Sequence, residues 1–225
     1  MMREFEILIP AAKARWDAFV ANHPAATVFH LAGWADVMKT AYGHKSHFTI
    51  ASEAGQIKGV LPLIEIKSRL FGHALISNAF CVAGGPLATD EETRLALMKE
   101  AERTGRATGA QHVEMRDTQG APGWQIKDDL YAGFEREMDA DEVKNLLQIP
   151  RKQRAVVRKA IDGTFRITTD KDVDTFFNLF ARTVRDHGTP VFPKRFFSAI
   201  LNTFPDNADV LTIWKDGQPL SSVLS

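Results

Sequence analysis

The hydrophobic and polar positions at the start of the chain follow the order strand, helix, helix, hairpin. Residues 4–9 form a strand-like run, and residues 11–23 and 30–42 repeat apolar side chains at the i, i+3, i+4 spacing of amphipathic helices. Residues 46–67 then predict two strands around a tight turn. Pro62 lies in the second of these strands and predicts a bulge or an edge position, because proline has no N–H to donate.

The next stretch predicts further strands and a long helix. A buried strand is expected at about 74–81, and the capping-box pattern that begins at Thr89 predicts a helix that runs to about Arg106. Strands at 111–116 and 130–136 complete a first unit in the order β-α-α-β-β-β-α-β-β.

The same order of elements then returns. A strand-like run around Phe165 precedes two helices whose phenylalanines fall at helical spacing, and a second glycine turn follows. Phe5 and Phe165 are 160 residues apart, and the turn glycines Gly55 and Gly217 are 162 residues apart. This spacing predicts an internal repeat.

The repeat sets the expected organisation of the chain. We expect a mixed α/β (α+β) fold with a first domain at 1–138, a connecting basic helical segment at 139–162 and a second domain of the same kind at 163–225. The connecting segment holds predicted helices at 139–147 and 151–161. Since the second copy stops shortly after its hairpin, we expect that domain to be incomplete and the chain alone to be inactive.

Composition and charge restrict the possible binding partners and the cellular compartment of the protein. The 28 basic and 28 acidic side chains cancel, so bulk charge attracts neither nucleic acid nor an anionic membrane. The single cysteine, Cys81, cannot form a disulfide within the chain, and the first residues lack the apolar stretch of a signal peptide. Residues 70–89 carry no charge but are too polar for a spanning helix. We predict a cytoplasmic protein without a transmembrane segment.

Arg151, Arg154 and Arg158 are the strongest candidates for substrate binding. They fall on one stripe of a predicted helix, and clustered guanidinium groups suit phosphate or carboxylate groups because each presents a planar fork of donors. The alternative is a solvated helix whose arginines pair with nearby carboxylates, which are Asp139, Asp141, Glu142 and Asp162.

Three further positions are candidates that could instead be structural. The loop 83–86 is rich in glycine, but the acidic residues that open the following helix would repel a phosphate, so a turn beside a substrate cleft is expected. Arg116 ends a predicted strand and could bind substrate or form an ordinary ion pair. The basic loop 182–197 contains Lys194 and Arg195 and could be a functional surface or a well-ordered turn.

Catalytic residues and metal ligands are not evident. The seven histidines form no spacing typical of a metal site, so no metal is expected, and Cys81 lacks the context of a nucleophile. No P-loop, Rossmann fingerprint or Gly-x-Ser-x-Gly motif is present.

The order of several short motifs resembles the FemAB-type proteins, which pair two domains of the GNAT acyltransferase kind. The similar branch is the one associated with exosortase (PEP-CTERM) and exopolysaccharide systems. The motifs that carry the resemblance are Trp16-Asp17-Ala18-Phe19-Val20, Thr27-Val28-Phe29-His30 with Trp34, Gly59-Val60-Leu61-Pro62-Leu63, Phe71-Gly72, Gly84-Gly85, Arg151-Lys152-Gln153-Arg154 with Arg158-Lys159, and Gly188-Thr189-Pro190-Val191-Phe192.

The resemblance implies tandem GNAT-like domains, the second incomplete in this chain, and transfer of an acyl or aminoacyl group to an amine of a cell-envelope or exopolysaccharide precursor. It implies acyl-CoA or aminoacyl-tRNA as the donor, no permanently bound cofactor, and a small-molecule or lipid-linked amine as the acceptor. The family's basic residue at the start of the second domain's second helix is matched by Lys194 or Arg195.

Two other classes of function remain open at this stage. The basic helix could belong to a nucleic-acid-binding module, which would bind with a steep salt dependence. The chain could also be a non-catalytic scaffold of an export or polysaccharide pathway. The oligomeric state is undetermined, although an open sheet edge at 219–225 would favour self-association.

Overall fold

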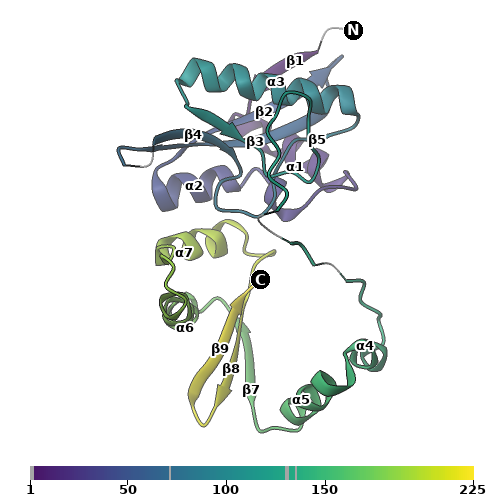
Figure 1. The fold of residues 1–225 in the computed structure, drawn as a ribbon, viewed down its shortest axis with the longest axis vertical. Helices are drawn as coiled ribbons and strands as arrows, with labels where there is room; N and C mark the ends of the chain where they lie inside the picture. Colours follow the sequence, from purple (N-terminus) through teal and green to yellow (C-terminus); the bar gives the residue numbers. More distant parts are fainter. Residues whose placement is uncertain (1–2, 71, 130–131, 135) are drawn as a thin grey trace.

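The protein is built on two β-sheets with helices packed against them (Figure 1). The computed structural model describes residues 3–70, 72–129, 132–134 and 136–225. The strands are β1 (Glu4–Ile7), β2 (Lys45–Glu53), β3 (Gln56–Ser68), β4 (Gly72–Ser77), β5 (Leu87–Ala88), β6 (His112–Glu114), β7 (Arg166–Asp170), β8 (Val210–Lys215) and β9 (Gln218–Leu224). The α-helices are α1 (Lys13–Ala21), α2 (Trp34–Tyr42), α3 (Glu91–Thr108), α4 (Glu142–Gln148), α5 (Arg151–Ile161), α6 (Val173–Asp186) and α7 (Lys194–Thr203).

The first sheet has the order β1-β2-β3-β4-β6, with β5 paired to β3. Its pairs are antiparallel except β4 and β6, which run parallel and make the sheet mixed. Alternate side chains of the central strands point to opposite faces. Phe48 and Ile50 join the core with α1 and α2, whereas Leu61 and Leu63 pack with Leu97 of α3.

The internal repeat predicted from the sequence is present in the structure. Helices α1 and α6 begin at Lys13 and Val173, and α2 and α7 begin at Trp34 and Lys194, so both pairs are offset by 160 residues. The second sheet, β7-β8-β9, is antiparallel, and α6 packs against β8 and β9.

Both copies also use the same hairpin turn. Ala54 and Gly55 have φ angles of 49° and 78°, and Asp216 and Gly217 have φ angles of 50° and 76°. Two successive positive φ values define the type I′ turn, whose twist matches the strands that it joins.

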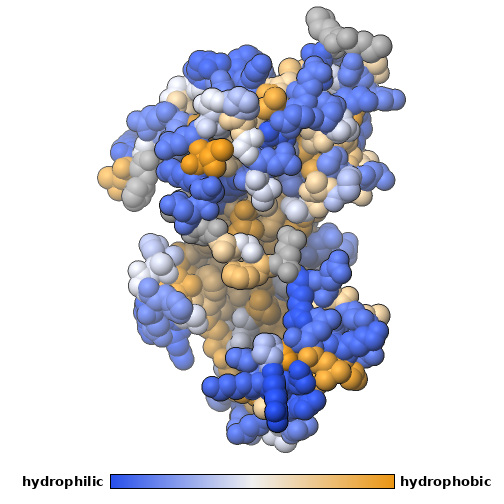
Figure 2. Space-filling view, turned by 45° about the vertical axis from the view of Figure 1, so that its right-hand side comes forward, coloured by the Kyte–Doolittle hydropathy of each residue, from blue (hydrophilic) through white to orange (hydrophobic). Residues whose placement is uncertain are grey.

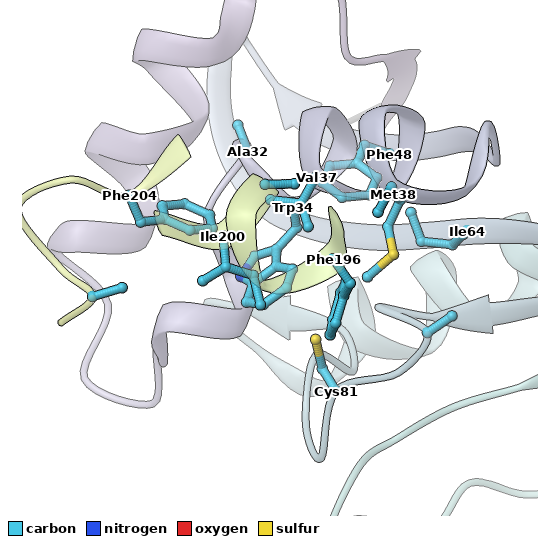
Figure 3. Close-up of a cluster of buried hydrophobic side chains, with 14 of the residues drawn as sticks. Ala32, Trp34, Val37, Met38, Phe48, Ile64, Cys81, Phe196, Ile200 and Phe204 are labelled. Atoms are coloured by element: carbon cyan, nitrogen blue, oxygen red, sulfur yellow. The ribbon is translucent and has the colours of Figure 1, made fainter. Parts of the chain in front are cut away.

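The equivalent helices of the two copies, α2 and α7, pack against each other and join the halves through one core. The ring centroids of Trp34 and Phe204 are 5.3 Å apart, and Phe196 and Ile200 of α7 lie in the same buried cluster as Met38 of α2 (Figure 3). This contact was not predicted, because helical periodicity identifies a buried face but not its partner.

Two strand predictions differ from the structure. Strand β4 ends at Ser77 rather than near residue 81, because Asn78 has a φ of 37° and turns the chain out of the sheet. Of the strand expected at 130–136, the described residues 132–134 and 136 are not in a strand, and residues 130, 131 and 135 lie outside the described residues.

Pro62 lies inside the central strand β3, opposite Phe48, and not on an edge strand or at the bulge between Ala51 and Ser52. Its carbonyl accepts a hydrogen bond from the Asn78 N–H at 2.6 Å, and its nitrogen points the same way. On that side the pairing with β5 ends at Val60 and the pairing with β4 begins at Leu63, so no ladder bond requires an N–H from Pro62.

Candidate functional site

A group of aromatic side chains lies where the two halves of the protein meet. We call this group the aromatic platform; it consists of Tyr42, His44, Phe80, Phe192 and Phe196. The Tyr42 ring stacks on Phe80 at 4.7 Å and on His44 at 5.4 Å, measured between centroids. Phe192 and Phe196 meet Phe80 edge-on at 5.8 and 6.3 Å.

The end of α2 positions the first two rings. Tyr42 is the last residue of the helix, and Gly43 follows with a φ of 73°. The N–H groups of Gly43 and His44 return to the carbonyls of Lys39 and Met38 at 2.9 and 3.3 Å, which closes the helix in the manner of a Schellman motif. This sharp ending folds the His44 ring back onto Tyr42.

The loop after β4 positions Phe80 in an uncommon backbone conformation. Asn78 and Phe80 have φ angles of 37° and 67°, which are costly for residues other than glycine. Asn78 holds the loop in place, since its side-chain amide donates to the Phe29 carbonyl at 2.6 Å. Its Oδ1 is buried without a hydrogen-bond partner among the described residues.

Burial sets the electrostatics of the platform. It raises the pKa of Tyr42, and the nearby positive charge of Arg195 opposes that rise. Burial also lowers the pKa of His44. The Tyr42 hydroxyl is buried without a hydrogen-bond partner among the described residues, and the Tyr42 ring packs against those of Phe80 and Phe196. The platform therefore combines aromatic ring faces with the nearby positive charge of Arg195.

Cys81 follows Phe80 in the chain, and its thiol is buried, which disfavours the reactive thiolate. Burial raises its pKa to about 12, and the charge of Arg116 offsets this only in part. The Arg116 guanidinium donates to the Cys81 carbonyl and pairs with Glu114 at 3.1 Å. The structure therefore places Arg116 beneath the loop that carries Phe80, where it holds the backbone.

The glycine loop 83–86 is tightly packed. A Cβ at Gly84 would lie 2.6 Å from the Asn78 Cβ, and one at Gly85 would lie 2.8 Å from the Asp117 Cβ. The N-terminus of the next helix is already capped, because Asp90 accepts the Thr93 N–H at 2.7 Å. The glycines permit close approach of neighbouring chain segments, and the expected cap at Thr89 is corrected to Asp90, whose side chain faces the helix.

The six predicted basic residues are not gathered at one place. Arg195 lies close enough to Tyr42 to affect its pKa, and Lys194 beside it pairs with Asp174. The three arginines of α5 lie on the other side of the second sheet from α6 and α7 (Figure 1).

The acidic residues near α5 do not form ion pairs with its arginines in the described part of the chain. Arg154 donates to the carbonyls of Leu147 and Ile149 at 2.6 and 2.9 Å, and so caps the end of α4. Asp139 pairs with Lys144 at 3.1 Å, and Asp141 accepts the Val143 N–H. Within the described residues, the ion pairs expected between these carboxylates and the α5 arginines are not formed.

A separate surface hollow of about 590 Å³ lies beside α1, away from the platform, and is lined in part by Phe19, His23 and Thr89. The His23 ring is hydrogen-bonded to the Ala88 carbonyl at 2.9 Å, and no described Lys or Arg side chain lines the hollow.

Over the described ranges, no group of three or more potential metal ligands is assembled. None of the described helices is both long and apolar enough to cross a bilayer.

The aromatic platform was missed by sequence reasoning. Phe80 and Phe192 lie in loops, outside the helical periodicity that identified the other phenylalanines. The available signal was their position beside turn residues, namely Asn78 before Phe80 and the Gly188–Pro190 turn before Phe192.

Comparison with solved structures identifies the fold. The chain superposes on FemX, a protein of the FemAB family, with a TM-score of 0.63 and 17% identity over 93% of this chain and 57% of FemX. It also matches a GNAT family acetyltransferase from Staphylococcus aureus subsp. aureus USA300_TCH1516 and a transcriptional regulator from Bacillus halodurans C-125. Each has a TM-score of 0.41, covers 61% of this chain and is itself covered completely, at 8% and 9% identity.

No family model and no curated protein sequence matches the chain. The chain spans 57% of the length of FemX. The predicted α/β class with a mixed sheet is confirmed, and the fold is similar to that of FemX over a range that includes both sheets.

Proposed function

We propose that the chain is part of a FemAB-type N-acyl or aminoacyl transferase that modifies an amine of a cell-envelope or exopolysaccharide precursor in the cytoplasm. The observation that carries this proposal is the agreement with FemX over 93% of the chain, which includes both copies of the repeat. The motif order described above favours the exosortase-associated branch. Residues 1–138 and 163–225 would be the two GNAT-like domains, joined by the segment 139–162.

The donor in this proposal is acyl-CoA or aminoacyl-tRNA, used as a substrate, and the acceptor is a small or lipid-linked amine. The neutral amine attacks the carbonyl carbon of the donor, the new C–N bond forms, and the thioester or ester bond to the leaving group breaks. The amine proton passes to a base, and positioning with backbone donors to the oxyanion supplies most of the rate. No described residue is assigned as that base.

The aromatic platform and the start of α7 are proposed to bind the acceptor. Arg195 adds a full charge to the positive end of a helix whose first N–H groups lack a side-chain cap. Beside it, the buried Tyr42 hydroxyl has no partner among the described residues, and it would donate to an acceptor oxygen once the acceptor displaces the side chains that cover it. Lys194 pairs with Asp174 at the surface, and an anionic acceptor would compete with Asp174 for it. Arg116 contributes indirectly, by holding the Cys81 carbonyl.

The test uses the protein expressed from the complete reading frame that contains this chain. Acyl-CoA and aminoacyl-tRNA are offered separately with a pooled amine extract, and products are identified by mass spectrometry. We expect transfer from one donor. Arg195→Gln should raise the KM for the acceptor at least about tenfold with a smaller change in kcat, because it removes one charged contact.

Arg185→Gln is the matched control, since Arg185 is exposed near the end of α6 and pairs with Asp186. Its kinetics should match the parent protein. Absence of transfer from both donors, with a folded protein and a verified acceptor, would favour the scaffold alternative. Salt-sensitive RNA binding without transfer would favour the nucleic-acid-binding module.

A further inference from the structure

Helix α5 has two sharply separated faces. At 100° per residue, its apolar arc contains Val156, Val157, Ala160 and Ile161, whereas Arg151, Lys152, Arg154, Arg158 and Lys159 form the opposite arc. The helix contains no acidic residue. In a protein with zero net charge, this is a strong local concentration of positive charge.

The apolar arc is exposed to solvent. No residue of α5 is buried, and Val156 and Ile161 are each 68% exposed. The partner helix α4 also has exposed apolar side chains, with Val143 at 62% and Leu147 at 52%. An amphipathic helix in a globular protein normally buries its apolar stripe, so among the described residues these side chains lack the contact that their pattern favours.

Most of the positive arc is also without side-chain partners among the described residues. Arg154 caps α4, but Arg151, Lys152, Arg158 and Lys159 form no side-chain hydrogen bond or ion pair within the described part of the chain. Among the described elements, α4 is the main neighbour of α5, and the contact between the two helices is small. Figure 2 shows apolar surface bordered by hydrophilic surface over this hairpin, at the lower right of the view.

We propose that α5 lies on an anionic phospholipid surface, with its apolar arc among the acyl chains and its basic arc at the headgroups. A helix of this composition binds in the plane of the interface, where apolar burial and attraction to anionic lipid act together. A nucleic acid would satisfy the basic arc alone and offers nothing to a stripe of valine and isoleucine. A lipid surface satisfies both arcs.

The inference goes beyond the proposed function, because lipid binding by α5 requires neither donor nor acceptor. A peripheral contact of this kind would bring the protein close to a lipid-linked acceptor. The membrane contact can fail while transfer to a soluble amine succeeds, and the reverse is equally measurable.

The 225-residue chain is tested by co-sedimentation with vesicles of phosphatidylglycerol and phosphatidylcholine in equal parts, and with vesicles of phosphatidylcholine alone. We expect binding to the anionic vesicles that weakens as NaCl rises from about 0.05 M to about 0.5 M. The quadruple change R151Q/K152Q/R158Q/K159Q should weaken partitioning at least about tenfold. The double change V156S/I161S should weaken it at least about threefold at unchanged charge.

The matched control for charge neutralises four exposed basic residues elsewhere, as R69Q/K99Q/K127Q/K215Q. It removes the same net charge and should bind vesicles like the parent chain. Circular dichroism confirms folding of each variant, which the surface positions favour. Equal loss of binding in the control, no effect of V156S/I161S, or no binding to anionic vesicles would each overturn the proposal. Tighter binding to RNA than to vesicles, with V156S/I161S unaffected, would assign α5 to nucleic acid.

Discussion

The Tyr42 hydroxyl is a buried donor whose position serves no contact within the described protein. Leaving such a group without a partner costs roughly 1–3 kcal/mol, so its removal should not destabilise the fold. We expect Tyr42→Phe to leave the free energy of unfolding unchanged or to raise it by about 1 kcal/mol. Urea denaturation measures this directly. If the same variant binds the acceptor more weakly while its stability is unchanged, the hydroxyl contributes to binding and not to folding.

Thr212→Val is the contrasting variant, because the buried Thr212 hydroxyl is hydrogen-bonded to Ser222 Oγ at 2.8 Å. It removes a buried hydroxyl that has a partner and should lose about 1–2 kcal/mol. If Tyr42→Phe lost as much as Thr212→Val, the Tyr42 hydroxyl would have a structural partner, and its role in the platform would have to be abandoned.

Glu65 is the residue that links stability to pH. Its carboxylate accepts Nε2–H groups from His47 at 2.9 Å and from His73 at 2.8 Å, and the His47 hydrogen bond is the main cause of its lowered pKa. A carboxyl whose pKa is lower in the folded state stabilises the protein above its unfolded pKa, which is near 4.5 here. That stabilisation is lost as the pH falls through the lower, folded-state pKa.

We therefore expect Glu65→Gln to be less stable than the parent chain at pH 6, with the difference shrinking as the pH falls below about 4.5. Denaturant unfolding across this range checks the sign. Glu53→Gln removes a carboxylate for which no described ion pair exists and should show no such convergence. A difference for Glu65→Gln that stays constant with pH would mean that the carboxylate is not responsible.

At the scale of elements, the packing between the start of α2 and the end of α7 depends on Gly33. A Cβ there would lie 2.7 Å from Phe204 Cε1 and 2.8 Å from Thr203 Cγ2, although the backbone φ of −57° suits any residue. We expect Gly33→Ala to cost about 1–3 kcal/mol of unfolding free energy through overpacking. Gly133→Ala, whose Cβ would meet nothing within 4 Å, is the control for thermal or urea unfolding. Equal stability of the two variants would show that the helices separate without cost.

The sequence predicted the elements of the repeat well because amphipathic helices and glycine turns are local signals. Helices α6 and α7 and both I′ turns lie where the pattern placed them. Features that depend on distant neighbours were missed, namely the pairing of α2 with α7 and the gap in β3 pairing that accommodates Pro62. The substrate roles of Arg151, Arg154 and Arg158 stay predictions, because charge clustering does not identify a partner.

At the scale of the whole molecule, the two halves share a core and should not behave as independent domains. Trp34 and Met38 of the first half lie in one buried cluster with Phe196, Ile200 and Phe204 of the second. A common core couples the stability of both sheets, since opening the junction exposes apolar surface on each side. The aromatic platform lies at this junction, and residues of both halves hold its rings in place.

Phe204→Ala tests this coupling. The ring is 6% exposed, and its removal should cost about 3–5 kcal/mol. Hydrogen exchange followed by mass spectrometry should show this loss at the amides of β2, in the first half, as well as at those of β8. Leu220→Ala, at a side chain 52% exposed on β9, should change neither by more than about 1 kcal/mol. If exchange accelerated in β8 while β2 kept its protection, the halves would unfold separately, and an acceptor site built from both would open without global unfolding.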